Sequence, residues 1–362
     1  MTALEPGVDR GPSDRGAIDA RPIHHGDVDL RVRLGSLELA NPIVTGSGTF
    51  GSGAEINRFF DVARLGAVVV KSVTLEPREG LPTPRMAETA SGMLNAIGLQ
   101  NPGIERWLAK DLPWLNDHGV ATIVSIAGKT TQEYRTLAEH LRGAPGVVAI
   151  EANISCPNVE DRGIVFACRQ EATREAIEGV ARVARVPVFA KLTPDVTDIA
   201  DIAEAAAAAG ATGVSVINTL LGMAIDVETR RPRLAAVTGG LSGPAIKPVA
   251  IRAVHQIHQR LPSLPIIGMG GVRSVEDVVE FLLAGASAVA VGTATFANPM
   301  AALELLEALP RWLARRGVAS VAELRGALVG GEPGREPGRE PGREPGREPG
   351  RESGGGARPE AT

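Results

Sequence analysis

Eight short runs rich in Val, Ile and Ala alternate along the chain with longer segments of helical periodicity, and this alternation restricts the fold more than any other feature. The runs lie at residues 42–45, 67–71, 121–126, 147–153, 187–192, 213–218, 265–268 and 287–291. Helical segments separate them, among them 199–209, 244–260, 275–284 and 300–312. Eight strands that alternate with helices favour an α/β fold of the TIM (β/α)8 barrel type over an open sheet.

The composition agrees with such a barrel. Apolar residues make up 44% of the 362 residues but aromatic residues only 3%, so the core must consist mainly of Val, Ile, Leu and Ala. These residue types suit parallel strands that are covered on both faces. Residues 30–39 predict an extra N-terminal hairpin that could close the bottom of the barrel.

Both ends of the chain differ from the barrel region. Residues 1–28 are rich in Gly, Pro, Asp and Arg, and Arg-Glu-Pro-Gly is repeated four times between Arg335 and Gly350. Pro and Gly break regular structure and the alternating charges resist burial, so both ends are expected to be disordered. The predicted organisation is a disordered extension (1–28), a barrel (29–329) and a low-complexity disordered tail (330–362).

Charge and cysteine content exclude several classes of function. A formal net charge of -4 predicts no general attraction to nucleic acid or anionic lipid. With only Cys156 and Cys168 and no Cys/His spacing of a metal site, a reducing compartment and no metal are expected. The N-terminal region lacks the apolar run of a secretory signal, and no run of about 18 apolar residues occurs. We therefore expect a cytoplasmic protein that does not span a membrane.

The residues at the ends of the predicted strands are mainly glycines, amides and lysines, with no acid pair and no histidine. In a TIM barrel the active residues lie at these carboxyl ends. They suit a flat, anionic ligand that carries a phosphate, because glycines after the last two strands let backbone N–H groups approach a phosphate. The alternative is that these glycines only form tight turns. The strand-end positions are 45–51, Lys71, Ser72, 153–158, Lys191, 217–219, 268–271, Gly292 and Thr293.

One motif at these positions is misleading. Residues 46–51 (GSGTFG) match the dinucleotide fingerprint GxGxxG, which requires an acidic residue about 20 positions later to bind ribose. The next strand ends at Lys71 instead, so we reject a Rossmann site.

Lys71 and Lys191 both end apolar strands, where a lysine is costly to bury without an anionic partner. Each could extend its ammonium to water at the barrel rim, but two such lysines favour contact with an anion or a flavin.

Cys156 is the candidate general base because it lies in a loop just beyond a strand end. Taken alone, a cysteine is more often an inert apolar residue. Its unperturbed pKa of about 8.5 leaves some thiolate at neutral pH, and a nearby lysine would increase that fraction. Ser155 is a rival base that would need an activating partner. Cys168 is interpreted as structural, and His255 and His258 as part of a solvated helix surface.

Several long motifs together resemble the class 1 dihydroorotate dehydrogenases. They are residues 95–103 (NAIGLQNPG), 153–158 (NISCPN), 217–222 (INTLLG), 239–248 (GGLSGPAIKP) and 268–271 (GMGG), and the resemblance covers residues 30–328. The first and fourth motifs resemble subclass 1B, which passes electrons towards NAD. Cysteine at 156 also resembles class 1, whereas the membrane-bound class 2 enzymes use serine and carry an N-terminal membrane helix, which is not expected here.

The resemblance implies one FMN per chain and dihydroorotate as the substrate. Cys156 would be the base, and the loop up to Gly163 would close over the substrate. The implied cofactor-binding residues are Ser47, Lys71, Ser72, Ser125, Asn153, Lys191, Ile217, Gly243, Gly270, Gly271, Gly292 and Thr293. The implied substrate-binding residues are Lys71, Asn95, Ala96, Ile97, Gly98, Leu99, Asn153, Asn218 and Thr219. Ser125 departs from the family, which has Asn there, so a water could mediate its contact with FMN.

Subclass 1B also implies a partner, because its members work with a separate subunit that carries FAD and a [2Fe-2S] cluster around a homodimeric core, a heterotetramer in all. Two cysteines are too few to hold such a cluster in this chain. The alternatives are a fumarate-linked class 1A enzyme, another FMN barrel such as a dihydrouridine synthase, and a barrel that merely binds a sugar phosphate.

Overall fold

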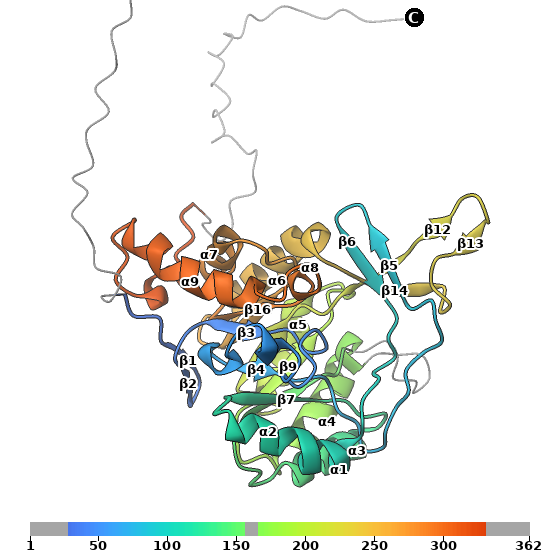
Figure 1. The fold of residues 1–362 in the computed structure, drawn as a ribbon. Coiled ribbons are helices and arrows are strands. Elements are labelled where there is room, and N and C mark those ends of the chain that lie inside the picture. Colours follow the sequence, from blue (N-terminus) through green and yellow to red (C-terminus); the bar gives the residue numbers. More distant parts are fainter. Residues whose placement is uncertain (1–27, 156–165, 331–362) are drawn as a thin grey trace, which may run out of the picture. The chain divides into compact units, whose positions relative to one another are not determined.

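The protein is described from a computed structural model, which places residues 28–155 and 166–330. Eight parallel strands form one sheet in the order β3-β16-β15-β10-β9-β8-β7-β4, and a bridge between Val44 and Ala67 joins its two ends (Figure 1). The predicted TIM barrel is therefore confirmed. The strands are β3 (Ile43–Thr45), β4 (Val68–Val69), β7 (Thr122–Ile126), β8 (Val147–Ala152), β9 (Val188–Leu192), β10 (Gly213–Val216), β15 (Ile266–Met269) and β16 (Ala288–Val291).

Helices that follow the strands pack against one another in chain order around this sheet. The longer ones are α3 (Thr131–His140), α4 (Gln170–Ala181), α5 (Ile199–Ala208), α6 (Lys247–Arg260), α7 (Val275–Ala284) and α9 (Ala301–Ala314). The shorter ones are η1 (Ile56–Arg58), η2 (Val62–Arg64), α1 (Ile104–Arg106), η3 (Trp107–Asp111), α2 (Leu112–Asp117), η4 (Phe166–Cys168), η5 (Pro244–Ile246), α8 (Ala294–Ala297) and η6 (Val321–Leu324). Ser274 begins α7 with a capping box to Asp277.

The strands are buried on both faces, and Val, Ile and Ala dominate their side chains. The predicted hairpin is also present as β1 (Val32–Leu34) and β2 (Leu37–Leu39). Leu34 and Leu39 enter the core, and the turn at Gly35 lies against Thr212, just before the amino end of β10. The hairpin therefore covers the end of the barrel opposite the strand-end residues.

The structure also contains an antiparallel sheet that was not predicted from the sequence. It has the order β11-β14-β6-β5 and stands apart from the barrel sheet in Figure 1. Its strands are β5 (Met86–Thr89), β6 (Gly92–Asn95), β11 (Leu220–Met223) and β14 (Thr238–Ser242), and β12 (Ile225–Asp226) and β13 (Arg231–Pro232) form a further hairpin. Asn95 pairs with Gly240 in this sheet, which brings the segment after Asn95 beside the residues that follow β10.

The predicted disorder of the two ends concerns residues that lie almost wholly outside the described part of the chain, as do Cys156 and the loop up to residue 165. The chain divides into two units, Met1–Ala327 and Leu328–Thr362, and the barrel lies in the first. Within the described residues, no helix is both long enough and apolar enough to cross a membrane.

The interpretation of His258 as a solvated surface residue is wrong. Its ring is packed against Gly285 and Gly326, and its Nδ1 atom is buried without a hydrogen-bond partner in the described structure. Burial, together with the charge of Arg325 and the nearby His255, lowers the pKa of His258 from its usual value. The ring is therefore neutral in the folded protein near neutral pH.

This burial predicts that acid destabilises the fold through His258. The folded-state pKa lies below the unfolded value of about 6.5, so the unfolded chain takes up the proton more readily. The free energy of unfolding should then fall as the pH drops below about 6.5, and His258→Asn should reduce this slope. Urea unfolding across pH measures it, with His118→Asn as the control, because His118 is exposed and is not among the groups that lower the pKa of His258. Equal slopes in the wild type and the His258 variant would contradict the assignment.

Candidate active site

The carboxyl ends of the barrel strands open into a cavity of about 1070 Å³. Ligand sites typically occupy about 300–1,000 Å³, so this space can hold a nucleotide-sized group together with a small substrate. Most of the residues predicted for the site line it: Ser47, Lys71, Ser72, Asn95, Ile97, Gly98, Leu99, Asn153, Lys191, Ile217, Asn218, Thr219, Gly243, Gly270, Gly271, Gly292 and Thr293.

Two predicted site residues lie behind the wall of the cavity. Ala96 packs with Leu94 and Leu234, and its backbone N–H donates to the carbonyl of Arg85. Ser125 is fully buried, and its hydroxyl lies 2.8 Å from that of Ser72. Ser125 therefore supports Ser72, which lines the cavity, but does not line the cavity itself.

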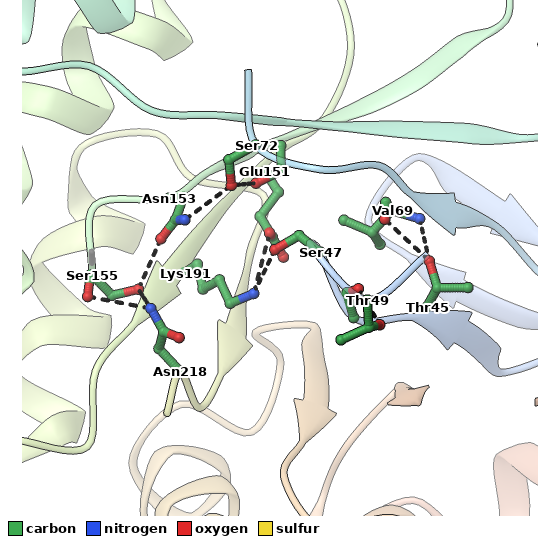
Figure 2. A network of polar contacts seen from close by, with 12 residues as sticks. Thr45, Ser47, Thr49, Val69, Ser72, Glu151, Asn153, Ser155, Lys191 and Asn218 are labelled. Atoms are coloured by element: carbon green, nitrogen blue, oxygen red, sulfur yellow. Dashed lines mark hydrogen bonds and ion pairs between the residues drawn. The ribbon is translucent and has the colours of Figure 1, made fainter. Parts of the chain in front are cut away.

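A chain of buried and half-buried amides and hydroxyls runs along the ends of β4, β8 and β10 (Figure 2). Asn153 Nδ2 donates to Ser72 Oγ at 3.0 Å, Ser155 Oγ donates to Asn153 Oδ1 at 3.1 Å, and Asn218 Nδ2 donates to Ser155 Oγ at 2.8 Å. These bonds fix the orientation of both amides. Ser155 is hydrogen-bonded to an amide on each side. An amide is too weak a base to deprotonate the Ser155 hydroxyl, so Ser155 lacks the activating partner that a catalytic base would need.

Lys191 is buried at the end of β9. Its Nζ donates to Ser47 Oγ at 2.8 Å and lies 3.5 Å from Glu151 Oε1 (Figure 2). Glu151 was not predicted as a site residue, because it lies two residues before Asn153 and thus within the strand, whereas the predicted site residues lie at strand ends. A charged residue within the apolar run 147–153 was the available signal. The anionic partner that Lys191 requires is thus present in the chain.

Lys71 lies at the opposite wall and is half-buried. Its ammonium lies over Gly48, where a Cβ atom would come within 3.2 Å of Nζ. Gly48 also has a φ of +89°, which a residue with a side chain rarely adopts. The glycine-rich segment after β3 thus makes room for this lysine, as well as bringing the backbone to the cavity.

The glycines after β15 and β16 form a cradle at one end of the cavity. Gly271 has a φ of +79°, and a Cβ atom there would lie 2.9 Å from the carbonyl oxygen of Gly243. A Cβ at Gly292 would meet only Thr49 Cγ2, at 3.9 Å, so this position faces open space. Arg273, which was not predicted, also lines the cavity and adds a positive charge. Open backbone positions beside a cation fit a bound phosphate.

Asn101 holds the segment that follows β6 and was also missed. Its Nδ2 donates to the carbonyl of Leu99 at 2.7 Å, and its Oδ1 accepts from the N–H groups of Gly103 and Thr74. Leu99 has a φ of +56°, which costs energy for a residue with a side chain. The buried amide of Asn101 therefore stabilises a strained backbone at the cavity wall.

Asn101→Ala is expected to raise the KM for the substrate about tenfold and to change kcat little, since it removes several buried hydrogen bonds that order this wall. Steady-state kinetics would measure both constants. Asn41→Ala is the matched control. Asn41 is similarly buried and also bonds two backbone groups, but these belong to Arg64 and Ile43, which do not line the cavity, whereas Leu99 does. A normal KM in Asn101→Ala would contradict this role.

Comparison with known proteins places this barrel in a family. The family model described as dihydroorotate dehydrogenase matches residues 29–313, well over half of the chain. The chain belongs to the dihydroorotate dehydrogenase family. The resemblance drawn from the strand-end motifs is thus confirmed.

Relatives of this dihydroorotate dehydrogenase chain agree on the subclass. A Geobacillus sp. protein is 52% identical over 297 residues, which cover 82% of this chain and 95% of the relative. A Trichlorobacter lovleyi protein is 50% identical over 301 residues, covering 83% and 99%. Both are named dihydroorotate dehydrogenase B (NAD(+)), catalytic subunit. The fold is shared with a dihydroorotate dehydrogenase from Eimeria tenella crystallised with ferulenol, at a TM-score of 0.69, 23% identity and coverage of 83% and 88%.

Proposed function

We propose that this chain is the catalytic subunit of an NAD-linked dihydroorotate dehydrogenase, which oxidises (S)-dihydroorotate to orotate in pyrimidine synthesis. The main support is the convergence of amides, two lysines and a glycine cradle on one cavity, in a chain about half identical to relatives of that name. Dihydroorotate is a small cyclic anion with amide edges, and both its charge and its amide edges have counterparts among the cavity residues.

The cavity residues suit FMN as the cofactor, which accepts a hydride when it is bound. Gly270, Gly271, Gly292 and Thr293 would hold its phosphate. The volume of the cavity and the open position at Gly292 support this assignment. The remaining contacts would come from Ser47, Lys71, Ser72, Asn153, Lys191, Ile217 and Gly243.

The same cavity supplies partners for the substrate. Lys71 would bind the carboxylate, and Asn95, Asn153, Asn218 and Thr219 would bind the amide edges, together with the backbone of 97–99. Asparagine offers both a donor and an acceptor, and the fixed amides of Asn153 and Asn218 present one pattern to the ligand. Such preorganisation lowers the barrier by orienting the reacting atoms.

Cys156 would remove the proton from C5 of dihydroorotate while the hydrogen on C6 leaves with its electron pair, so that the C5–C6 double bond of orotate forms. The residue follows directly after Ser155, which the amide network holds at the end of β8. Its position in the sequence thus carries this assignment, since Cys156 itself lies outside the described residues.

The electrons would pass to NAD through a second subunit with FAD and a [2Fe-2S] cluster, on a homodimeric core in the cytoplasm. The words "catalytic subunit" in the relatives' names support a partner. Exposed apolar side chains around β11 to β13, among them Leu221, Ile225 and Val227, would suit a protein contact.

The test is dihydroorotate-dependent reduction of NAD by the purified chain, alone and with a candidate FAD and iron–sulfur subunit. We expect NADH only when both are present. Fumarate reduction by the chain alone would instead identify a class 1A enzyme. Activity on dihydrouridine in tRNA, or a protein that binds sugar phosphate but no flavin, would overturn the proposal.

A further inference from the structure

Glu151 is the most deeply buried charged residue beside the cavity. Its side chain is 1% exposed, and it lies on β8 next to Lys191 of β9, whose side chain is 6% exposed. The two are separated by 3.5 Å between Oε1 and Nζ, at the outer limit of a hydrogen bond. The other oxygen, Oε2, is buried and has no hydrogen-bond partner among the described residues.

This arrangement is a poor way to stabilise a fold. A buried ion pair repays the loss of hydration only when its geometry is good and its remaining polar atoms are bonded. Here the contact is long and one oxygen is unsatisfied, so apolar side chains of the same volume would stabilise the barrel at least as well. A role of Glu151 in the function of the site explains it better than a role in stability.

The positions of the two side chains indicate what that role is. Lys191 lines the cavity, whereas Glu151 lies behind it and does not. Ser47 accepts a hydrogen bond from the same ammonium, so Nζ is held by both a hydroxyl and a carboxylate (Figure 2). Glu151 can therefore reach a ligand in the cavity only through Lys191 and through the electric field of its own charge.

We propose that Glu151 is a positioning residue that holds the ammonium of Lys191 against the cofactor cavity and limits, by its opposite charge, how strongly Lys191 favours reduced flavin. This inference rests on the proposed function, because it requires FMN in the cavity. A cation near a flavin stabilises the reduced, anionic form, and a carboxylate behind the cation weakens that effect. Loss of the carboxylate should therefore favour reduction.

The test is an anaerobic redox titration of FMN bound to the reconstituted chain, against dyes of known potential. Glu151→Gln should shift the reduction equilibrium towards reduced FMN at least about tenfold, a rise of about 30 mV for a two-electron couple. Glu151→Asp keeps the charge but withdraws it from Nζ, and should shift the equilibrium in the same direction by about threefold. If Glu151→Gln does not fold, the aspartate variant decides.

Ser215→Ala is the matched control. Ser215 is the register partner of Lys191 on β10, is equally buried, and also has an unsatisfied oxygen, but it carries no charge. Its replacement should change the equilibrium between oxidised and reduced FMN by less than about twofold. An unchanged or lowered reduction potential in both Glu151 variants would overturn this inference but not the proposed function. A shift in Ser215→Ala as large as that in the Glu151 variants would do the same. A wild-type chain that binds no FMN would overturn the proposed function and this inference with it.

Discussion

Replacing Cys156 with Ala is expected to slow the reduction of bound FMN by dihydroorotate by about 10²- to 10⁴-fold, the usual contribution of a general base. Binding of FMN and of substrate should change little, because Lys71, Asn153 and Asn218 remain in place. Single-turnover absorbance under anaerobic conditions measures the rate directly. Since product release and the NAD-linked step do not enter such a measurement, the full loss should be visible.

Cys168→Ala is the control for this variant. Cys168 is half-buried, and its Sγ lies 3.9 Å from the carbonyl oxygen of Asp195. Burial, and to a lesser extent the charge of Asp195, raises the pKa of its thiol, so little thiolate is available there. This variant should reduce FMN at the wild-type rate. A near-normal rate in Cys156→Ala would remove Cys156 from the mechanism.

Gly292→Ala is expected to weaken FMN binding by about tenfold to a hundredfold without destabilising the chain. The added methyl group would meet only Thr49 Cγ2, at 3.9 Å, so the protein itself accommodates it. It would instead occupy space at the cradle where a phosphate oxygen should lie, and each factor of ten in affinity corresponds to about 1.4 kcal/mol. Quenching of flavin fluorescence gives the Kd, and urea unfolding of the FMN-free chain gives its stability.

Gly179→Ala is the matched glycine control, since Gly179 lies within α4 and a Cβ there meets nothing closer than 3.6 Å. It should leave the Kd for FMN unchanged and stabilise the helix by about 0.5–1 kcal/mol. If Gly292→Ala binds FMN as tightly as the wild type does, the phosphate does not lie at this glycine.

The barrel could be predicted from the sequence because its signal is local. Each run such as 121–126 or 187–192 is mainly apolar, since both of its faces are buried, and each is followed by a helical pattern. The site followed from the same signal, because residues at the carboxyl ends of parallel strands must converge. Lys71, Asn153, Lys191 and Asn218 do line one cavity.

The second sheet could not be predicted in this way. β5 and β6 are short and mostly half-buried or exposed, and β14 contains two glycines, so none of the three strands carries a continuous apolar pattern. Their pairing depends on contacts between residues about 145 positions apart, such as Asn95 with Gly240. The role of Asn101 was not predicted either. It depends on the strained backbone of Leu99, which is visible only in the folded chain.

The burial of titratable side chains was also not predicted from the sequence. The apolar run around Glu151 indicates a buried strand but not which residue faces the carboxylate, and nothing in the sequence around His258 indicates that its ring is packed inside. Polar residues on strands and helices are usually exposed. The burial of Glu151 results from the register of β8 with β9, which sets it beside Lys191. That of His258 results from two glycines, Gly285 and Gly326, which leave room for its ring.

Transfer of a hydride from dihydroorotate to FMN bound in this barrel is tested most directly by anaerobic stopped-flow absorbance of the FMN-reconstituted chain mixed with dihydroorotate. We expect the oxidised flavin band to bleach and one orotate to form for each FMN reduced. Bound FMN that dihydroorotate does not bleach would contradict the assigned substrate, and a chain that binds no FMN would contradict the assignment as a flavin oxidoreductase.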